Sequence, residues 1–504
     1  MANTLPVPDV DTADTKQSWF TRPLSTSWCV VGYIVATGVF MACIAIPGGP
    51  AVGDAFEIIY PTWAVAHGQF ACMYPPHPAS VPSYASPVFP LINGAVGFVT
   101  QIGHGATFPT GPALGHNCNN AIDAMVRWSQ KTGAVFPTLW SACVGWLVLM
   151  GGLLSVLRAS GRGRTGWEPA TLVLVACLPP LWMSIEMYAH PQDIVAMGFS
   201  LAALGFALRS RWIGSGVFTA LAVLAQPFGI LVAIPLFVVA PAAQKLRYVT
   251  GAVVGVVVID LPLLLLTSGS AAHTIFLGSG NAVGRGTTVL WEIHLPSTLL
   301  VQVSRIAPLV ACFLVAWLVQ RRLGSAALQP PALVSLVAVC LSLRLVFEDN
   351  LFSYYFLALA VILVVVDVVH GHLRQTVIAW LIMVSLVYSE PVIFVWRHSW
   401  DENVRHWLPV IVMIVALLLI MRDVLRHAAG WNTFMWIATV ITTLVVWPLS
   451  NDPFNRHPSQ WVWQVVLVSI GVVLAVTPLW TIIRGQATPS PVETPDPAEV
   501  PSIA

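Results

Sequence analysis

Acidic side chains are rare in this chain, so the few segments that hold them are the first candidates for chemistry. Asp54 and Glu57 stand three residues apart in segment 53–61, a spacing that places both carboxylates on one face of a helix. A partly desolvated carboxylate has a raised pKa and can take a proton from a hydroxyl group. Asp54 is therefore a candidate general base, with Glu57 beside it. The structural alternative is that Asp54 caps a short helix.

A second candidate segment is the turn at 186–193, which separates two apolar runs. Glu186, His190 and Asp193 lie in it, around Pro191. Proline accounts for the turn, and Asp193 could cap the helix that follows. Three ionisable groups are nevertheless more than a turn requires. We therefore predict that His190 and Asp193 bind a substrate.

A third candidate segment begins at Arg344, near the end of an apolar run. A buried arginine is costly unless it pairs with a carboxylate or a phosphate, so it is a candidate for function. Glu348, one helical turn further on, offers a structural ion pair instead. Asp349 and Tyr354 follow directly, and the whole segment is predicted to bind substrate.

A fourth polar stretch, 268–297, adds Arg285 and His294 to the candidate residues, with no spacing that favours either. The chain has no zinc-binding HExxH or CxxC motif, and it has no glycine-rich phosphate loop of the nucleotide-binding proteins. The sequence therefore supports no metal site and no cofactor, and a divalent cation stays open as an alternative without a motif behind it.

Composition identifies the elements that must hold these residues. Hydrophobic residues make up 57% of the chain and charged residues 9%, with a mean hydropathy of +0.79. Soluble proteins carry roughly 25% charged residues. Apolar runs of about 20 residues recur along the chain, and that is the length of a membrane-spanning helix. The sequence thus predicts an all-α polytopic membrane protein with about 12–14 spans and membrane lipids around it. A net charge of +1 without basic patches argues against a nucleic-acid partner.

The apolar runs give the positions of these spans. Several of these runs are short for a hydrocarbon core of ~30 Å, so they could be half-helices or tilted pairs. Predicted spans are 28–47, 134–157, 169–187, 193–209, 212–224, 226–240, 248–267, 298–320, 329–346, 351–369, 375–393, 408–421, 431–447 and 461–483.

Basic residues orient the spans, because short loops rich in lysine and arginine stay in the cytoplasm. The rule predicts a cytoplasmic segment 1–27, a transmembrane domain 28–483 and a long external loop 48–133. The apolar run 86–103 is interpreted as an interfacial or re-entrant segment of that loop. The polar tail 484–504 is predicted to be disordered and cytoplasmic. All the candidate residues then fall at or beyond the outer membrane face.

Two cysteines, Cys72 and Cys118, lie in the predicted external loop, whereas the others mostly lie in apolar runs. Disulfides form in such oxidising surroundings. We predict a bond between Cys72 and Cys118. The alternative is two free thiols packed against the membrane surface.

Several of these features together resemble the GT-C glycosyltransferases, which use polyprenyl-phosphate sugars. The resemblance covers roughly residues 28–270 and is greatest to the bacterial polyprenyl-phosphate mannosyltransferases, including the α-1,2-mannosyltransferases of envelope glycolipids. It rests on one spanning helix, an external loop with an early Asp54, the stretch 56–70, Met73-Tyr74-Pro75-Pro76, Tyr84-Ala85-Ser86-Pro87, the turn 190–193, Arg209-Ser210-Arg211-Trp212 and the break at Gln226-Pro227.

The resemblance implies a reaction and a place for it. Asp54 would deprotonate a hydroxyl of a glycolipid or glycan acceptor, and this oxygen would attack the anomeric carbon of the donor sugar with inversion. Polyprenyl phosphate would leave, helped by the positive charge of Arg344, Arg285 or His190. The sugar implied is mannose, with arabinofuranose as the alternative. The reaction would occur on the extracytoplasmic face of a bacterial plasma membrane.

Two other classes of function stay open. A secondary transporter or a flippase for lipid-linked glycans would place an ionisable group at mid-membrane, and Asp260 beside Pro262 is such a group. A scaffold subunit without chemistry of its own is the third class. The one-sided distribution of polar residues favours the enzyme.

Overall fold

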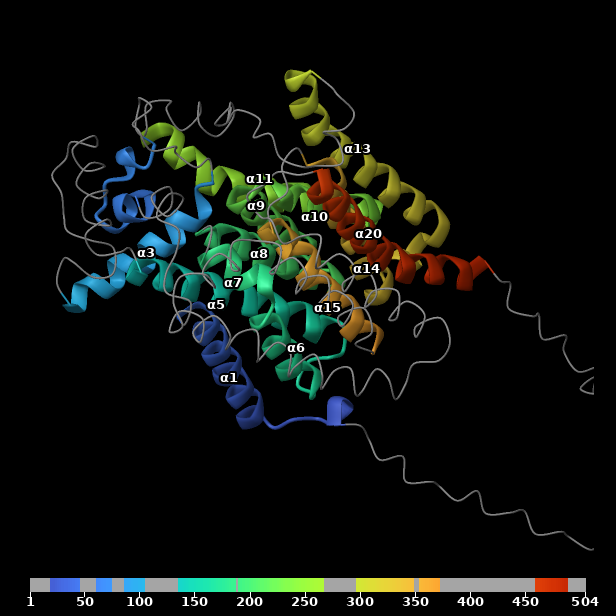
Figure 1. Ribbon diagram of the computed structural model, residues 1–504, viewed down its shortest axis with the longest axis horizontal. Coiled ribbons are helices and arrows are strands. Elements are labelled where there is room, and N and C mark those ends of the chain that lie inside the picture. The colour runs from blue at the N-terminus through green and yellow to red at the C-terminus, as the bar shows by residue number, and fades with distance from the viewer. Residues whose placement is uncertain are drawn as a thin grey trace, which may run out of the picture.

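A computed structural model of the protein describes residues 19–45, 60–74, 86–104, 135–186, 189–266, 296–348, 353–371 and 458–487. Every regular element in these ranges is a helix (Figure 1), and one isolated bridge joins Pro23 to Thr165. The prediction of an all-α membrane protein is confirmed for this part of the chain.

Six helical stretches within the described ranges are long and apolar enough to cross a membrane, so the chain is a multi-pass membrane protein. They are α1 (Thr26–Ala45), α5 (Val135–Ala159), α8 (Pro191–Leu208), α11 (Ala242–Leu266), α13 (Ser297–Leu323) with the 3-10 turn η6 (Gly324–Leu328), and α14 (Pro330–Phe347).

Shorter helices correspond to the remaining predicted spans. The span predicted at 169–187 is two half-helices that break before Pro179, because proline disfavours a helical residue in front of it. These elements are α6 (Trp167–Ala176), α7 (Pro179–Glu186), α9 (Trp212–Ala225), η3 (Pro227–Gly229), α10 (Ile230–Val239), η7 (Ser353–Phe356) and α15 (Leu357–His370).

Two further helices are α3 and α20. The predicted interfacial segment 86–103 forms α3 (Val88–His104), in which buried Asn93 donates a hydrogen bond to Ser141 of α5. The final helix α20 (Pro458–Ala487) is longer than its predicted span. The spans predicted at 375–393, 408–421 and 431–447 lie outside the described residues, so the total of 12–14 spans stays a prediction.

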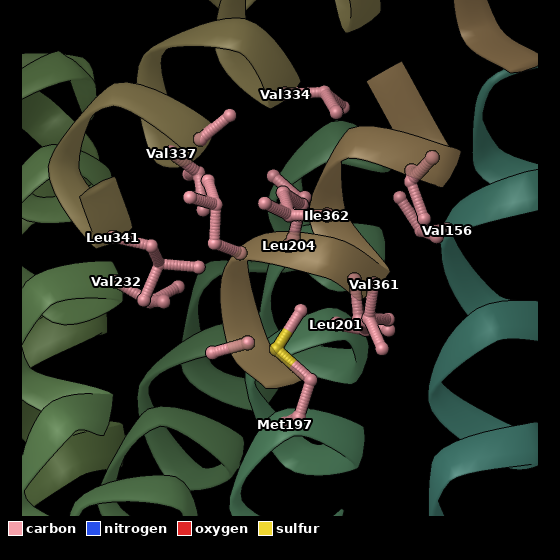
Figure 2. Close-up of a cluster of buried hydrophobic side chains, with 14 of the residues drawn as sticks. Val156, Met197, Leu201, Leu204, Val232, Val334, Val337, Leu341, Val361 and Ile362 are labelled. Carbon is pink, nitrogen blue, oxygen red and sulfur yellow. The ribbon is translucent and has the colours of Figure 1, made fainter. Parts of the chain in front are cut away.

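The core of the helical body lies around α8, which is buried along nearly its whole length. Figure 2 shows Met197, Leu201 and Leu204 of α8 in one cluster with Val232 of α10 and with side chains of α14 and α15. At the edges of the body, α1, α11 and α13 leave rows of valine, leucine and isoleucine exposed. These exposed faces are suited to lipid contact.

Glycines let α5 and α8 approach until their backbones touch. A Cβ atom added at Gly152 would lie 2.1 Å from the carbonyl oxygen of Gly198, so no larger residue fits there without movement. Close crossings of this kind are frequent between helices in membranes. Because Pro191 begins α8 next to Gly145, this crossing also fixes where the turn before α8 lies.

Nine basic residues lie at or just after the C-terminal ends of α5, α8 and α13, or near the start of α11, and we call these helix ends the basic end: Arg158, Arg162, Arg164, Arg209, Arg211, Lys245, Arg247, Arg321 and Arg322. Arginine side chains there donate hydrogen bonds to backbone carbonyls of other helices. Arg162 donates to the carbonyl of Val369 (3.1 Å), and Arg209 donates to that of Ser155 (3.0 Å).

A buried carboxylate reinforces the basic end. Glu168 of α6 is fully buried, pairs with Arg158 of α5 (3.3 Å) and accepts a hydrogen bond from Tyr33 of α1. The backbone N–H of Arg164 is a further donor to Glu168 (2.8 Å). These bonds connect three helices to the loop between α5 and α6, so Glu168 has a structural role.

Candidate functional site

Three segments far apart in the sequence meet at the end of the body opposite the basic end. The ring of His190 stacks on that of Tyr354, with centroids 4.6 Å apart and planes at 13°. Asp193 interacts electrostatically with both His190 and Arg344. We call this group the polar cluster; it comprises His190, Gln192, Asp193, Gln226, Arg344, Glu348, Tyr354 and Tyr355.

The turn before α8 carries part of the polar cluster and has an unusual backbone. Ala189 has φ +51°, in the left-handed region that costs most residues about 1 kcal/mol. Its N–H donates to the carbonyl of Ile185, and that of His190 donates to Ser184, which ends α7. Pro191 then starts α8 at a position where a missing N–H costs nothing. His190 therefore precedes α8, and Asp193 lies in its first turn.

His190 is held on two sides and is 3% exposed. Its Nδ1 lies 2.7 Å from Nε2 of Gln192, and an amide nitrogen can only donate. In this arrangement Nδ1 accepts the hydrogen bond from the Gln192 amide. Tyr354, which covers one face of the imidazole, also meets Tyr355 edge-on at 4.6 Å.

Asp193 is 3% exposed and makes a side-chain hydrogen bond with Gln226. Gln226 ends α9 in an extended conformation, as expected for a residue before proline. Among the described residues, no hydrogen-bond donor meets Oδ1 of Asp193 or Oε1 of its neighbour Gln192. Two buried acceptor oxygens thus remain unsatisfied within the polar cluster.

Arg344 lies at the end of α14, in contact with a carboxylate and two aromatic rings. Its Nε donates to Oε2 of Glu348 at 2.9 Å. The guanidinium carbon lies 4.4 Å from the ring centre of Tyr355 and 5.2 Å from that of Phe228. Cation–π contacts of this geometry add to the ion pair. The hydrogen bond to Glu348 uses Nε, so the two terminal Nη groups of Arg344 take no part in that bond.

The structure thus brings together five of the residues selected from sequence: His190, Asp193, Arg344, Glu348 and Tyr354. The ion pair of Arg344 with Glu348, which was the structural alternative to a binding role, is present. Arg344 also interacts electrostatically with Asp193, so the pair is part of the polar cluster. Sequence reasoning missed Gln192, Gln226 and Tyr355. For these three residues, the one local signal in the sequence was the break that Pro227 makes in the apolar run at Gln226.

The other candidate residues cannot be placed in this way. Asp54, Glu57, Asp349, Arg285 and His294 lie outside the described residues, and their roles stay predictions.

One of the two cysteines of the predicted disulfide, Cys72, lies among the described residues. Cys72 is bonded in a disulfide, whereas six other cysteines are free: Cys29, Cys43, Cys143, Cys177, Cys312 and Cys340. Cys118 lies outside the described residues, so its pairing with Cys72 stays a prediction.

A second polar position lies on α11. Asp260 is 6% exposed, and its Oδ1 meets no donor among the described residues. The segment around η2 (Phe70–Cys72) packs against α11, and Tyr74 interacts electrostatically with Asp260. Burial raises the pKa of Tyr74, and the Asp260 carboxylate raises it further, so this phenol stays protonated at neutral pH.

No protein-family model matches the chain, and no curated protein matches it either. The polar cluster is therefore interpreted from its own chemistry. It combines a guanidinium that Glu348 holds through Nε, two buried acceptor oxygens without a donor among the described residues and a stack of aromatic rings. Within the described ranges, no group of three His, Cys, Asp or Glu side chains is arranged to hold a metal ion.

Proposed function

We propose that the protein is an inverting glycosyltransferase that uses a polyprenyl-phosphate sugar as donor. It transfers the sugar, mannose or arabinofuranose, to a glycolipid or glycan acceptor at the extracytoplasmic face of a bacterial plasma membrane. The observation that carries this proposal is Arg344, whose guanidinium is bonded to Glu348 through Nε, so that both Nη groups stay outside this bond.

The geometry of Arg344 suits a phosphate. A guanidinium presents parallel N–H groups that match two phosphate oxygens, and such charge-assisted bonds are about twice as strong as neutral ones. Glu348 offsets part of the positive charge. Arg344 therefore contributes mainly directed donors, and the rings of Tyr355 and Phe228 keep these donors in place.

The position of the polar cluster also supports a lipid-linked donor. Its residues come from helix ends on the side of the body opposite the basic end. If short basic loops face the cytoplasm, the cluster faces outward. A donor with a polyprenyl tail has its phosphate at the membrane surface, so a binding site at the ends of spanning helices can reach it.

The proposed reaction balances as a single displacement. The Asp54 carboxylate takes the proton of the acceptor hydroxyl, and the oxygen forms a bond to the anomeric carbon. The bond from this carbon to the phosphate oxygen breaks, and its electron pair leaves with polyprenyl phosphate. Arg344 donates hydrogen bonds to the phosphate as its charge rises.

The test of this proposal is a transfer assay with the full chain in lipid nanodiscs. Radiolabelled short-chain polyprenyl-phosphoryl mannose or arabinofuranose is supplied with an envelope lipid extract as acceptor. We expect transfer by the natural chain and a loss of at least ~10²-fold in Asp54→Asn, the usual contribution of a general base. Glu57→Gln should lose less. Absence of transfer from both donors, or full activity of both variants, would contradict the proposal.

One observation favours a second candidate function, that of a secondary transporter or lipid-linked-glycan flippase. Asp260 is a buried acid on a spanning helix, next to Pro262, and one of its oxygens lacks a partner among the described residues. Buried acids of this kind carry protons or ions in transporters. Flipping of a fluorescent lipid-linked sugar in proteoliposomes, abolished by Asp260→Asn and unaffected by Asp54→Asn, would favour this candidate over the enzyme.

A further inference from the structure

We infer that Asp193 and Gln192 recognise the sugar of the donor, by accepting hydrogen bonds from its hydroxyl groups at Asp193 Oδ1 and Gln192 Oε1. This inference rests on the proposed function and deepens it, because it separates the residues that bind the sugar from Arg344, which binds the phosphate.

The first argument is the state of the two oxygens. Asp193 and Gln192 are 3% and 2% exposed, and neither oxygen meets a donor among the described residues. Buried polar atoms in folded proteins nearly always have a partner, and each one left without costs about 1–3 kcal/mol. Two such atoms on adjacent residues point to a ligand that completes them.

The second argument is the kind of partner they need. Both atoms are acceptors, so the ligand must bring donors. Two of the neighbouring protein donors already have partners: Gln192 Nε2 lies against the ring of His190, and Arg344 Nε is bonded to Glu348. A phosphate has only acceptor oxygens at neutral pH and would be repelled by the Asp193 carboxylate. Sugar hydroxyls bring donors, and a carboxylate is a strong acceptor for them.

The third argument is rigidity. Asp193 is held by Gln226 from a different helix, and its own N–H donates to the carbonyl of His190 at 3.2 Å. Gln192 is held through the ring of His190, which Tyr354 stacks upon. Acceptors fixed in this way discriminate well, because a sugar that lacks the matching hydroxyl leaves a buried oxygen unpaired.

Binding of two lipids tests the inference directly. The full chain in nanodiscs is titrated with a short-chain polyprenyl phosphate and with the same lipid carrying mannose. Asp193→Asn should weaken binding of the mannosyl lipid by about 10- to 100-fold, the equivalent of one lost charged hydrogen bond. Its affinity for the bare phosphate should stay within about twofold. Gln192→Met is the second variant, with the same expected direction.

A matched control comes from the same helix. Ser200 of α8 is also buried with an oxygen that lacks a partner in the described structure, but it lies outside the polar cluster. Ser200→Ala should bind both lipids as the natural chain does. Size-exclusion elution and the melting temperature show whether each variant is folded.

The outcomes separate this inference from the proposed function. If the natural chain binds both lipids and Asp193→Asn weakens both equally, or weakens neither, the inference is overturned and the proposed function stands. If the natural chain binds neither lipid, the proposed function is overturned and the inference with it. Mannosyl lipids that lack one hydroxyl sharpen the test. One of these hydroxyl groups should donate the hydrogen bond that Asp193 accepts. Removing that hydroxyl and introducing Asp193→Asn together should then weaken binding no more than either change alone.

Discussion

At Arg344, an ion pair and two aromatic faces act on one guanidinium. The bond to Glu348 uses Nε, and the contacts with Tyr355 and Phe228 use the flat faces of the group. Neither interaction consumes the Nη donors. A residue can therefore be structurally anchored and still be available to a ligand, and the presence of an ion pair does not argue against binding.

The substitution Arg344→Lys tests whether Nε binds Glu348 while the Nη groups bind the ligand. Lysine keeps the charge but has no planar fork, so it cannot hold Glu348 and a phosphate at the same time. We expect Arg344→Lys to bind polyprenyl phosphate at least about tenfold more weakly, the equivalent of one charge-assisted hydrogen bond. Arg209→Lys, at the basic end, is the control and should bind normally. Equal affinity in both variants would mean that Arg344 does not contact the phosphate.

The contacts of the polar cluster that were predictable from sequence are those between residues close together along the chain. Arg344 and Glu348 are one helical turn apart, so their pairing follows from helix geometry. Asp193 and Gln226 meet only because α8 and α9 pack together, and His190 meets Tyr354 across a much longer separation. No local pattern encodes such contacts. For the same reason Gln192, whose role depends on the ring of His190, was not selected.

At the scale of helices, hydropathy predicted the spans in the described ranges well, because the membrane imposes one length on every crossing segment. The ends differ where polar residues extend a helix. α11 begins at Ala242, before its predicted start, and includes Lys245 and Arg247. Long basic side chains reach from a helix end to the lipid headgroups, so the helix continues past the apolar run.

Two adjacent glycines of α5 give a matched test of helix packing. Gly152 touches the backbone of Gly198, whereas a Cβ at Gly151 would meet nothing within 4 Å. Gly152→Ala should lower stability by about 1–3 kcal/mol, as overpacking does, while Gly151→Ala should be tolerated. Melting of the detergent-purified variants measures this difference. Equal melting temperatures would show that α5 and α8 do not cross at Gly152.

At the scale of the whole molecule, the disulfide of Cys72 connects the segment over α11 to another part of the chain. If Cys118 is the partner, the bond closes a long loop and removes about 4 kcal/mol of chain entropy from the unfolded state. The loop would include α3, whose Asn93 is bonded to α5. The disulfide would therefore help to hold the predicted external loop on the helical body.

Maleimide labelling of the denatured chain tests the pairing of Cys72 with Cys118. We expect reduction to add two labels to the natural chain, because the other cysteines are free beforehand. In Cys118→Ser, reduction should add none, since Cys72 would then have lost its partner. Two further labels on the natural chain before reduction would contradict the bond, and a reducible bond that persists in Cys118→Ser would identify a different partner.

The separation between the basic end and the polar cluster also has an electrical consequence. The basic residues at one end of the body outnumber Arg344 at the other, where Asp193 and Glu348 are acidic, and this asymmetry forms a dipole along the direction of the spans. An energised membrane contributes about 2.3 kcal/mol per elementary charge and 100 mV to such an arrangement. The dipole has its lowest energy with the basic end on the negative side. Cellular respiration would then help to keep the polar cluster on the positive side, with a force that vanishes when the membrane is depolarised.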